Sequence, residues 1–180
     1  CAWDFCFDGI AACNDALNEL QKLQQSETVQ RNIAEIKVLR AYYYLLAVDC
    51  WGTVPFSIDK NSTDYPDPKD RAFMLPFLEK ELKDNMDLLD DTVSSKTYGR
   101  VTKYVAQFIL AKIYLNSEEW LGTPRYSELE SICKDIMGSG QFKLTDNYAA
   151  NFAIHNENGP EAVFAIPHSS VYTNNAFYIY

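Results

Sequence analysis

The residues that could do acid–base or metal chemistry are few, and their spacing matches no known catalytic pattern. The sequence contains two histidines, His155 and His168, which stand thirteen positions apart. Neither belongs to an HExxH motif, and no GxSxG nucleophile elbow is present. The adjacent carboxylates Glu118 and Glu119 could supply the acid pair of a glycosidase, but acids at a helix end usually face solvent. We therefore expect loop histidines, solvated carboxylates and a protein that is not an enzyme.

The cysteines do not form a metal-binding pattern either. There are five of them, Cys1, Cys6, Cys13, Cys50 and Cys133, and no Cys-x-x-Cys pair has a second half. An odd number leaves at least one free thiol, although one disulfide remains open. Cys6 and Cys13 share a helix face, where cysteine usually behaves as a small buried hydrophobe. The sequence thus predicts no bound metal and no cofactor.

The last thirteen residues, HSSVYTNNAFYIY, hold the side chains best suited to binding a ligand. Aromatic rings stack on the C–H face of a sugar, while neighbouring amides satisfy its hydroxyls in defined directions. Tyr172, Asn174, Asn175 and Tyr178 are therefore our candidate ligand-binding residues. The alternative is a loop that leads into a strand of a further part of the protein.

Composition sets the class of protein that must position these residues. A chain of 180 residues with 47% hydrophobic content is long enough for one globular domain. Its net charge of −9 repels phosphate backbones, so nucleic acid is not an expected partner. The sequence begins inside a helical pattern and ends on apolar residues, so we expect a fragment of a longer polypeptide.

Hydrophobic spacing predicts a mainly α-helical fold. Apolar residues recur at steps of three and four in five segments, and a polar loop with two prolines covers 57–69. A short β-like run, Glu161 to Pro167, follows near the C-terminus. The five predicted helices cover approximately residues 3–24, 29–51, 70–89, 102–116 and 126–137.

An internal repeat suggests how these helices pack. Shifting the sequence by 70 residues places LRAYYYLLAVDCWG on ILAKIYLNSEEWLG, with Ala41 over Ala111 and Tyr44 over Tyr114. This offset is close to twice the period of about 34 residues of tetratricopeptide helix pairs. We therefore expect antiparallel helix pairs stacked in a superhelix, each burying faces on both flanks.

The helix over 29–51 carries the most unusual side chains. Tyr42, Tyr43 and Tyr44 point about 100° apart, so they cannot form one sugar platform and should pack between repeats. Arg40 sits in the most apolar part, where we expect a structural ion pair with Glu35 or Asp49, or a cap on carbonyls of a neighbouring helix.

The end of this helix is also specified. Gly52 can adopt the left-handed conformation that ends a helix, and Pro55 prevents its resumption. We expect Trp51, at that boundary, to staple the helix end by packing.

Four stretches, in this order along the chain, resemble the motifs of the SusD/RagB family. The helix with Leu-Arg-Ala and aromatics that ends in Gly-x-Val-Pro is the most specific of them, although Cys50 replaces the usual aromatic. The others resemble the family's preceding Trp, Ile and Asn helix, its Gly-Arg-x-Thr-Lys helix and its Asn-Tyr, Phe and Glu-x-Ile-Phe segment. The stretches are WDFCFDGIAACNDALNEL, AEIKVLRAYYYLLAVDCWGTVPF, YGRVTKYVAQFILAKIYLN, and GQFKLTDNYAANF with EAVFAIP.

This resemblance implies a function and a place in the cell. Family members are lipoproteins of the outer membrane that capture oligosaccharides or other nutrients for a TonB-dependent transporter and catalyse nothing. The signal peptide and lipid anchor would lie outside this chain. Residues 1–160 would form the tetratricopeptide-like region, and 161–180 would begin the irregular ligand-binding part. The alternative is a helical-repeat scaffold that binds a protein partner without a small-molecule ligand.

Overall fold

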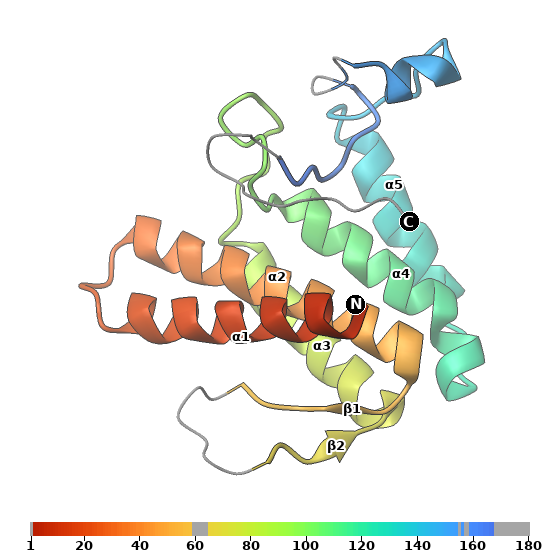
Figure 1. The fold of residues 1–180 in the computed structure, drawn as a ribbon. Coiled ribbons are helices and arrows are strands. Elements are labelled where there is room, and N and C mark those ends of the chain that lie inside the picture. The colour runs from red at the N-terminus through yellow and green to blue at the C-terminus, as the bar shows by residue number, and fades with distance from the viewer. Residues whose placement is uncertain (1, 59–64, 155, 157–158, 168–180) are drawn as a thin grey trace.

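A computed structural model describes residues 2–58, 65–154, 156 and 159–167, and it confirms all five predicted helices (Figure 1). Only the fourth helix ends much later than the spacing predicted, at Leu121 instead of residue 116. A 3₁₀ turn, Tyr148–Phe152, follows the last α-helix. The elements in chain order are α1 (Ala2–Gln21), α2 (Glu27–Trp51), β1 (Val54–Pro55), β2 (Pro68–Lys69), α3 (Arg71–Met86), α4 (Lys103–Leu121) and α5 (Tyr126–Gly138).

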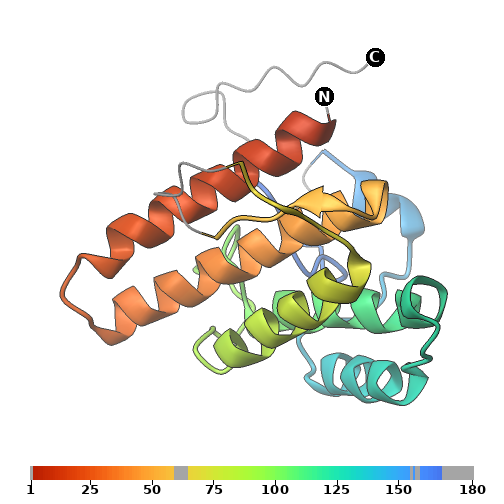
Figure 2. The same cartoon turned by 90° about the horizontal axis from the view of Figure 1, so that it is seen from below.

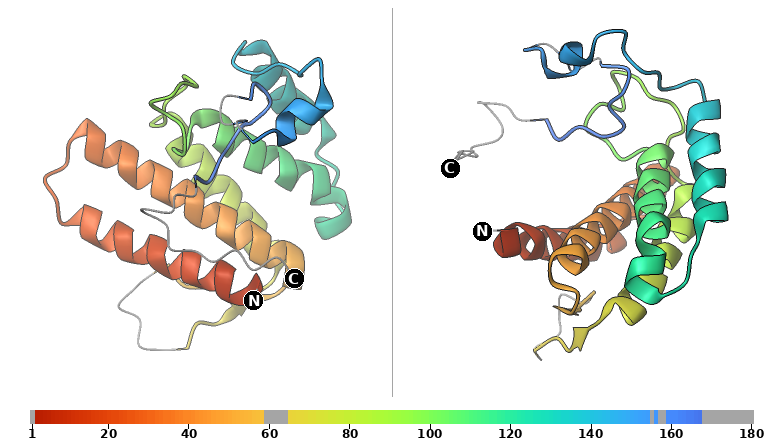
Figure 3. Two further views of the ribbon diagram at one scale, coloured as in Figure 1. Left: turned by 45° about the horizontal axis from the view of Figure 1, so that its top comes forward. Right: turned by 90° about the vertical axis from the view of Figure 1, so that its right-hand side faces the viewer.

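The helices form one curved layer in which each packs on the next. The contacts run from α1 to α2, α2 to α3, α3 to α4 and α4 to α5. Figure 2 shows the helices as successive rows, and the right-hand view of Figure 3 shows the bend of the layer. This arrangement confirms the predicted stack of helix pairs, and it gives α2 and α3 neighbours on two flanks.

Local capping explains where the helices begin and end. The side chain of Ser26 accepts a hydrogen bond from the backbone N–H of Val29, and Asp70 does the same for Phe73. Gly52 and Gly122 end α2 and α4 with φ of 74° and 70°, a region that side chains with a Cβ rarely adopt. Gly52 therefore ends α2 as predicted, although its ψ of −55° lies outside the left-handed helical region that Gly122 occupies.

The internal repeat is visible in the core. Tyr44 and Tyr114 are each 1% exposed, and Ala41 and Ala111 are also buried. The Tyr44 hydroxyl donates to the Ser57 carbonyl at 2.8 Å and accepts from the Ser57 N–H at 2.9 Å. The equivalent positions are therefore all core positions, although the two hydroxyls have different partners, since Tyr114 donates to Glu79.

The small sheet is not where the sequence predicted it. The run Glu161–Pro167 contains no strand, whereas β1 and β2 pair antiparallel, with Val54 opposite Lys69. A strand needs a partner edge, and the 161–167 segment meets helices instead, where Val163 and Phe164 pack against the core. The prediction of a short C-terminal β element was therefore wrong in position.

Candidate functional site

A large hollow in the described part of the chain lies between α2 and α4, beside the 161–164 segment. Its volume is about 520 Å³, and it combines rings and apolar side chains with a few polar groups. Such a mixture suits either a sugar ring or an apolar peptide side chain. We call it the aromatic groove; its rings are Tyr42, Phe108, Trp120 and Phe164, and its polar groups are Asp49, Lys112, Asn116 and Glu161.

The three consecutive tyrosines divide between the groove and the core. Tyr44 is buried, whereas Tyr42 and Tyr43 are half-buried with ring centroids 5.7 Å apart and planes tilted by 58°. Tyr43 also contacts Phe5, with the two ring centroids 5.5 Å apart. On the same helix as Phe5, Gly9 lies against the Tyr43 ring, and a Cβ at position 9 would come within 2.6 Å of it. The tilt means that the tyrosines form no flat platform, and packing is their main role, as predicted.

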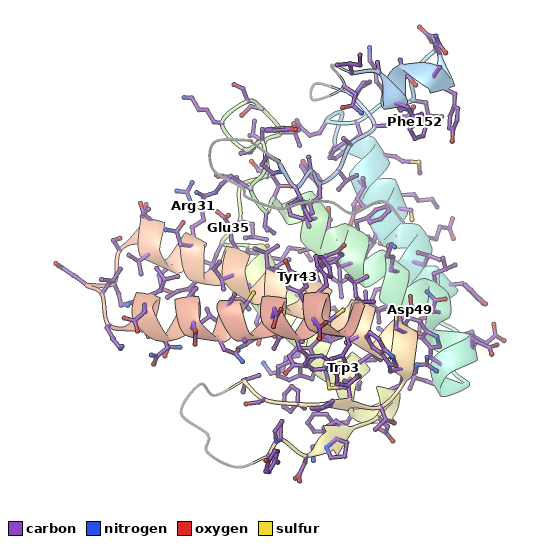
Figure 4. All side chains as sticks on the ribbon, in the orientation of Figure 1. Trp3, Arg31, Glu35, Tyr43, Asp49 and Phe152 are labelled. Carbon is purple, nitrogen blue, oxygen red and sulfur yellow. The ribbon has the colours of Figure 1, made fainter. Side chains whose placement is uncertain are left out.

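A second aromatic contact joins the ends of the first two helices. Trp51, the last residue of α2, meets Trp3 of α1 edge to face at 5.0 Å, and Trp3 contacts Phe7 at 4.3 Å. Figure 4 labels both Trp3 and Tyr43 near the N-terminal end of α1. The predicted role of Trp51 as a packing staple is confirmed.

Arg40 forms the predicted structural ion pair, but with a different partner. Its guanidinium pairs with Glu81 of α3 and donates to Asn14 of α1 at 2.9 Å. Burial raises the pKa of Glu81, and Arg40 opposes this rise. Glu35, one of the two carboxylates expected to pair with Arg40, instead pairs with Arg100 at 2.6 Å. In the fold, the Arg40 side chain lies between α1 and α3, so its partners come from other helices.

A second ion cluster, which the sequence did not reveal, joins α3 to the start of α5. Glu79 pairs with Arg125 and accepts hydrogen bonds from Lys83 at 2.6 Å and from the Tyr114 hydroxyl at 2.8 Å. Burial opposes ionisation of Glu79, but these donors outweigh it and lower its pKa to about 2. The four-residue spacing of Glu79 and Lys83 was a visible signal, whereas the contact with Arg125 depends on the tertiary fold.

The predicted ligand residues Tyr172, Asn174, Asn175 and Tyr178 lie outside the described residues, as do both histidines. The predicted solvated carboxylates Glu118 and Glu119 are exposed, as expected. Chemistry based on those four ligand residues therefore stays a prediction.

The described cysteines are all free thiols, and Cys6 and Cys13 are buried as expected. Within the described ranges, no group of three or more metal-ligating side chains comes together. Nor is any helix in that part of the chain both long and apolar enough to cross a bilayer.

Comparison with known proteins gives one consistent result. Residues 1–115 match the family model SusD-like_3, described as "Starch-binding associating with outer membrane". Among curated proteins, the chain is 27% identical over 155 residues to the starch-binding protein SusD of Bacteroides thetaiotaomicron. That alignment covers 86% of this chain and 27% of SusD. A SusD-like protein of Bacteroides ovatus is 28% identical, over 92% of this chain and 32% of its own length.

The fold of the chain also matches solved structures. A laminarin-binding SusD-like protein superposes with a TM-score of 0.81 at 23% identity, covering 91% of this chain and 36% of that protein. Surface glycan-binding protein A from B. thetaiotaomicron, in complex with laminarihexaose, gives a TM-score of 0.76 at 24% identity, covering 91% and 34%. The chain thus spans about a third of the length of these relatives.

Proposed function

The chain belongs to the SusD-like family, and on that premise we propose that it is the helical part of a cell-surface glycan-binding protein. The whole protein would capture an oligosaccharide at the outer membrane and deliver it to a TonB-dependent transporter, without catalysing a reaction. The family match over residues 1–115 is the observation that carries this proposal. The relatives named for binding starch and laminarin support an oligosaccharide as the ligand.

Within the sequence, we propose Tyr172, Asn174, Asn175 and Tyr178 as ligand contacts at the start of the ligand-binding part, 161–180. Their rings would stack on sugar C–H faces and their amides would bond hydroxyls. These groups are neutral, so affinity should depend little on salt, in contrast to binding dominated by ion pairs.

Affinity gel electrophoresis of the chain in gels that contain laminarin or soluble starch tests the proposal. We expect retardation by at least one of the two glycans. A Tyr172→Ala/Tyr178→Ala variant should bind about tenfold more weakly or worse, which corresponds to about 1.4 kcal/mol. The matched control is Tyr148→Ala/Phe152→Ala, which removes two exposed rings from the 3₁₀ turn and should keep wild-type retardation.

The second candidate function is a scaffold that binds a protein partner without a small molecule. It is favoured by the aromatic groove, where Phe108 and Leu115 leave 45% and 55% of their surface exposed. On this hypothesis a Phe108→Ser/Leu115→Ser variant should lose co-purification with the transporter, and neither the variant nor the wild-type chain should be retarded by a glycan. Absence of retardation in every gel, together with retained co-purification, would favour the scaffold over the glycan-binding protein.

A further inference from the structure

A second hollow, lined by none of the side chains that form the aromatic groove, opens between α1, α2 and α3. Its volume is about 380 Å³. Asn14, Arg40 and Glu81 line it, one from each helix, and they are 8%, 5% and 8% exposed. A hollow with buried charged side chains is uncommon, because such groups are normally fully paired or excluded from the core.

The hydrogen bonding of these three side chains is incomplete. The Arg40 guanidinium uses Nη1 for Asn14 and Nη2 for Glu81, while the Asn14 amide donates to the Ser57 carbonyl at 3.0 Å. Within the described ranges, no partner reaches Arg40 Nε, a donor, or Glu81 Oε2, an acceptor, and both atoms are buried. A buried donor or acceptor without a partner is unfavourable, so each of these atoms favours a group that can pair with it.

The charges around the hollow favour an uncharged ligand. Arg40 and Glu81 neutralise each other, and Lys80 at the rim pairs with Asp84. Lys37 adds one cation, close enough to Glu81 to act on its ionisation. The lining therefore holds two ion pairs and one further cation, Lys37, so a cation would find no unpaired counter-charge and an anion would find one at most.

The walls complete this description. Leu17, Phe77 and Ile58 contribute apolar surface, and Asn18 and Gln21 place side-chain amides at the mouth. Apolar walls with a few convergent polar groups are typical of pockets for small ligands. A hydroxyl can both accept a hydrogen bond, as Arg40 Nε requires, and donate one, as Glu81 Oε2 requires.

We propose that this hollow between α1, α2 and α3 is a binding site for a single uncharged sugar unit, distinct from the tail residues. The choice of a sugar among hydroxyl-bearing ligands rests on the proposed glycan-binding function. A hydroxyl of the sugar enters between the Arg40 and Glu81 side chains as they part, and its C–H face lies against Phe77. Arg40 Nε and Glu81 Oε2 are both buried in the ligand-free structure. Binding therefore requires the two side chains to move apart, and we expect it to be weak.

Nuclear magnetic resonance of the ¹⁵N-labelled chain tests this site, because the lining carries its own reporters. The Nε–H of Arg40 and the side-chain amides of Asn14 and Asn85 can be followed during titration with laminarihexaose and with maltohexaose. We expect saturable shifts of the Arg40 Nε–H signal with at least one of these probes, up to about 10 mM, which reports dissociation constants in the millimolar range. An Asn18→Trp variant fills the mouth and should abolish the shifts, and Gln21→Trp replaces it if the first variant fails to fold.

The outcomes distinguish a failure of this proposed site from a failure of the proposed glycan-binding function. The Tyr172→Ala/Tyr178→Ala variant should keep the Arg40 shift while it loses retardation in glycan gels. If wild-type chain is retarded but the Arg40 Nε–H signal does not move with either probe, the hollow holds ordered water only and the inference is overturned, while glycan binding stands. If the chain shows neither retardation nor shift, both proposals fail.

Discussion

The two glutamates of α3 stand two residues apart, yet their environments differ in kind. Glu79 faces Tyr114 of α4 and Arg125 at the start of α5, and three donors lower its pKa to about 2. Glu81 faces the other way, toward Arg40, and burial raises its pKa. The comparison teaches that the balance between burial and donors decides the sign of the shift: donors outweigh burial at Glu79, and burial outweighs the single charged donor at Glu81.

The difference follows from exposure as well as from partners. The Glu79 side chain is 17% exposed and lies at a helix junction where several donors have room to converge. The Glu81 side chain is 7% exposed and has one charged donor within hydrogen-bonding distance. We therefore expect the fold to lose far more stability when Glu81 loses its partner than when Glu79 loses one of its partners.

Removal of Arg40 should produce the largest effect. Arg40→Ala leaves the Glu81 carboxyl buried without its guanidinium, and the free energy of unfolding should fall by about 3–5 kcal/mol. Urea titration followed by far-ultraviolet circular dichroism measures this loss. The double variant Arg40→Met/Glu81→Met should recover most of it, because it removes both charges. A loss of less than about 1 kcal/mol in Arg40→Ala would show that the pair is not sealed from water.

Glu79 and Glu81 should contribute to the pH dependence of stability with opposite signs. Because the folded pKa of Glu79, about 2, lies below its ordinary 4.5, its ionised form stabilises the fold above pH 4.5. This contribution of about 1–3 kcal/mol, discounted for partial exposure, is lost as the pH falls toward 2. For Glu81, whose folded pKa is raised, the contribution is present below its ordinary 4.5 and is lost as the pH rises through the folded value.

Unfolding measured from pH 2 to pH 7 separates the two residues. The stability gap between wild type and Glu79→Gln should widen as the pH rises, and that between wild type and Glu81→Gln should narrow. If the two stability differences changed with pH in the same direction, the opposite contributions of Glu79 and Glu81 would be contradicted.

The smallest effect should come from a single hydroxyl of the Glu79 cluster. Tyr114→Phe removes one donor to Glu79 and should lower the free energy of unfolding by about 0.5–1.5 kcal/mol. Tyr44→Phe is the matched variant in the equivalent repeat, where the lost hydroxyl served Ser57 instead. Both variants should lose stability, but only Tyr114→Phe should raise the pKa of Glu79, measured by carboxyl carbon chemical shifts.

The sequence by itself determined the five helices, the end of α2 at Gly52 and the repeat that relates Tyr44 to Tyr114. These features depend on local spacing and on backbone conformations that glycine alone adopts easily, so they can be inferred without knowing the fold. The same motifs placed the chain in its family.

Only the tertiary structure decided which side chains meet. Arg40 finds Glu81 forty-one residues away, and Glu79 finds Arg125 forty-six residues away. The 161–167 segment lies on helices instead of pairing as a strand, and two hollows open between helices. Hydrophobic periodicity states which face of a helix is buried, but the crossing of the helices fixes which partner that face meets.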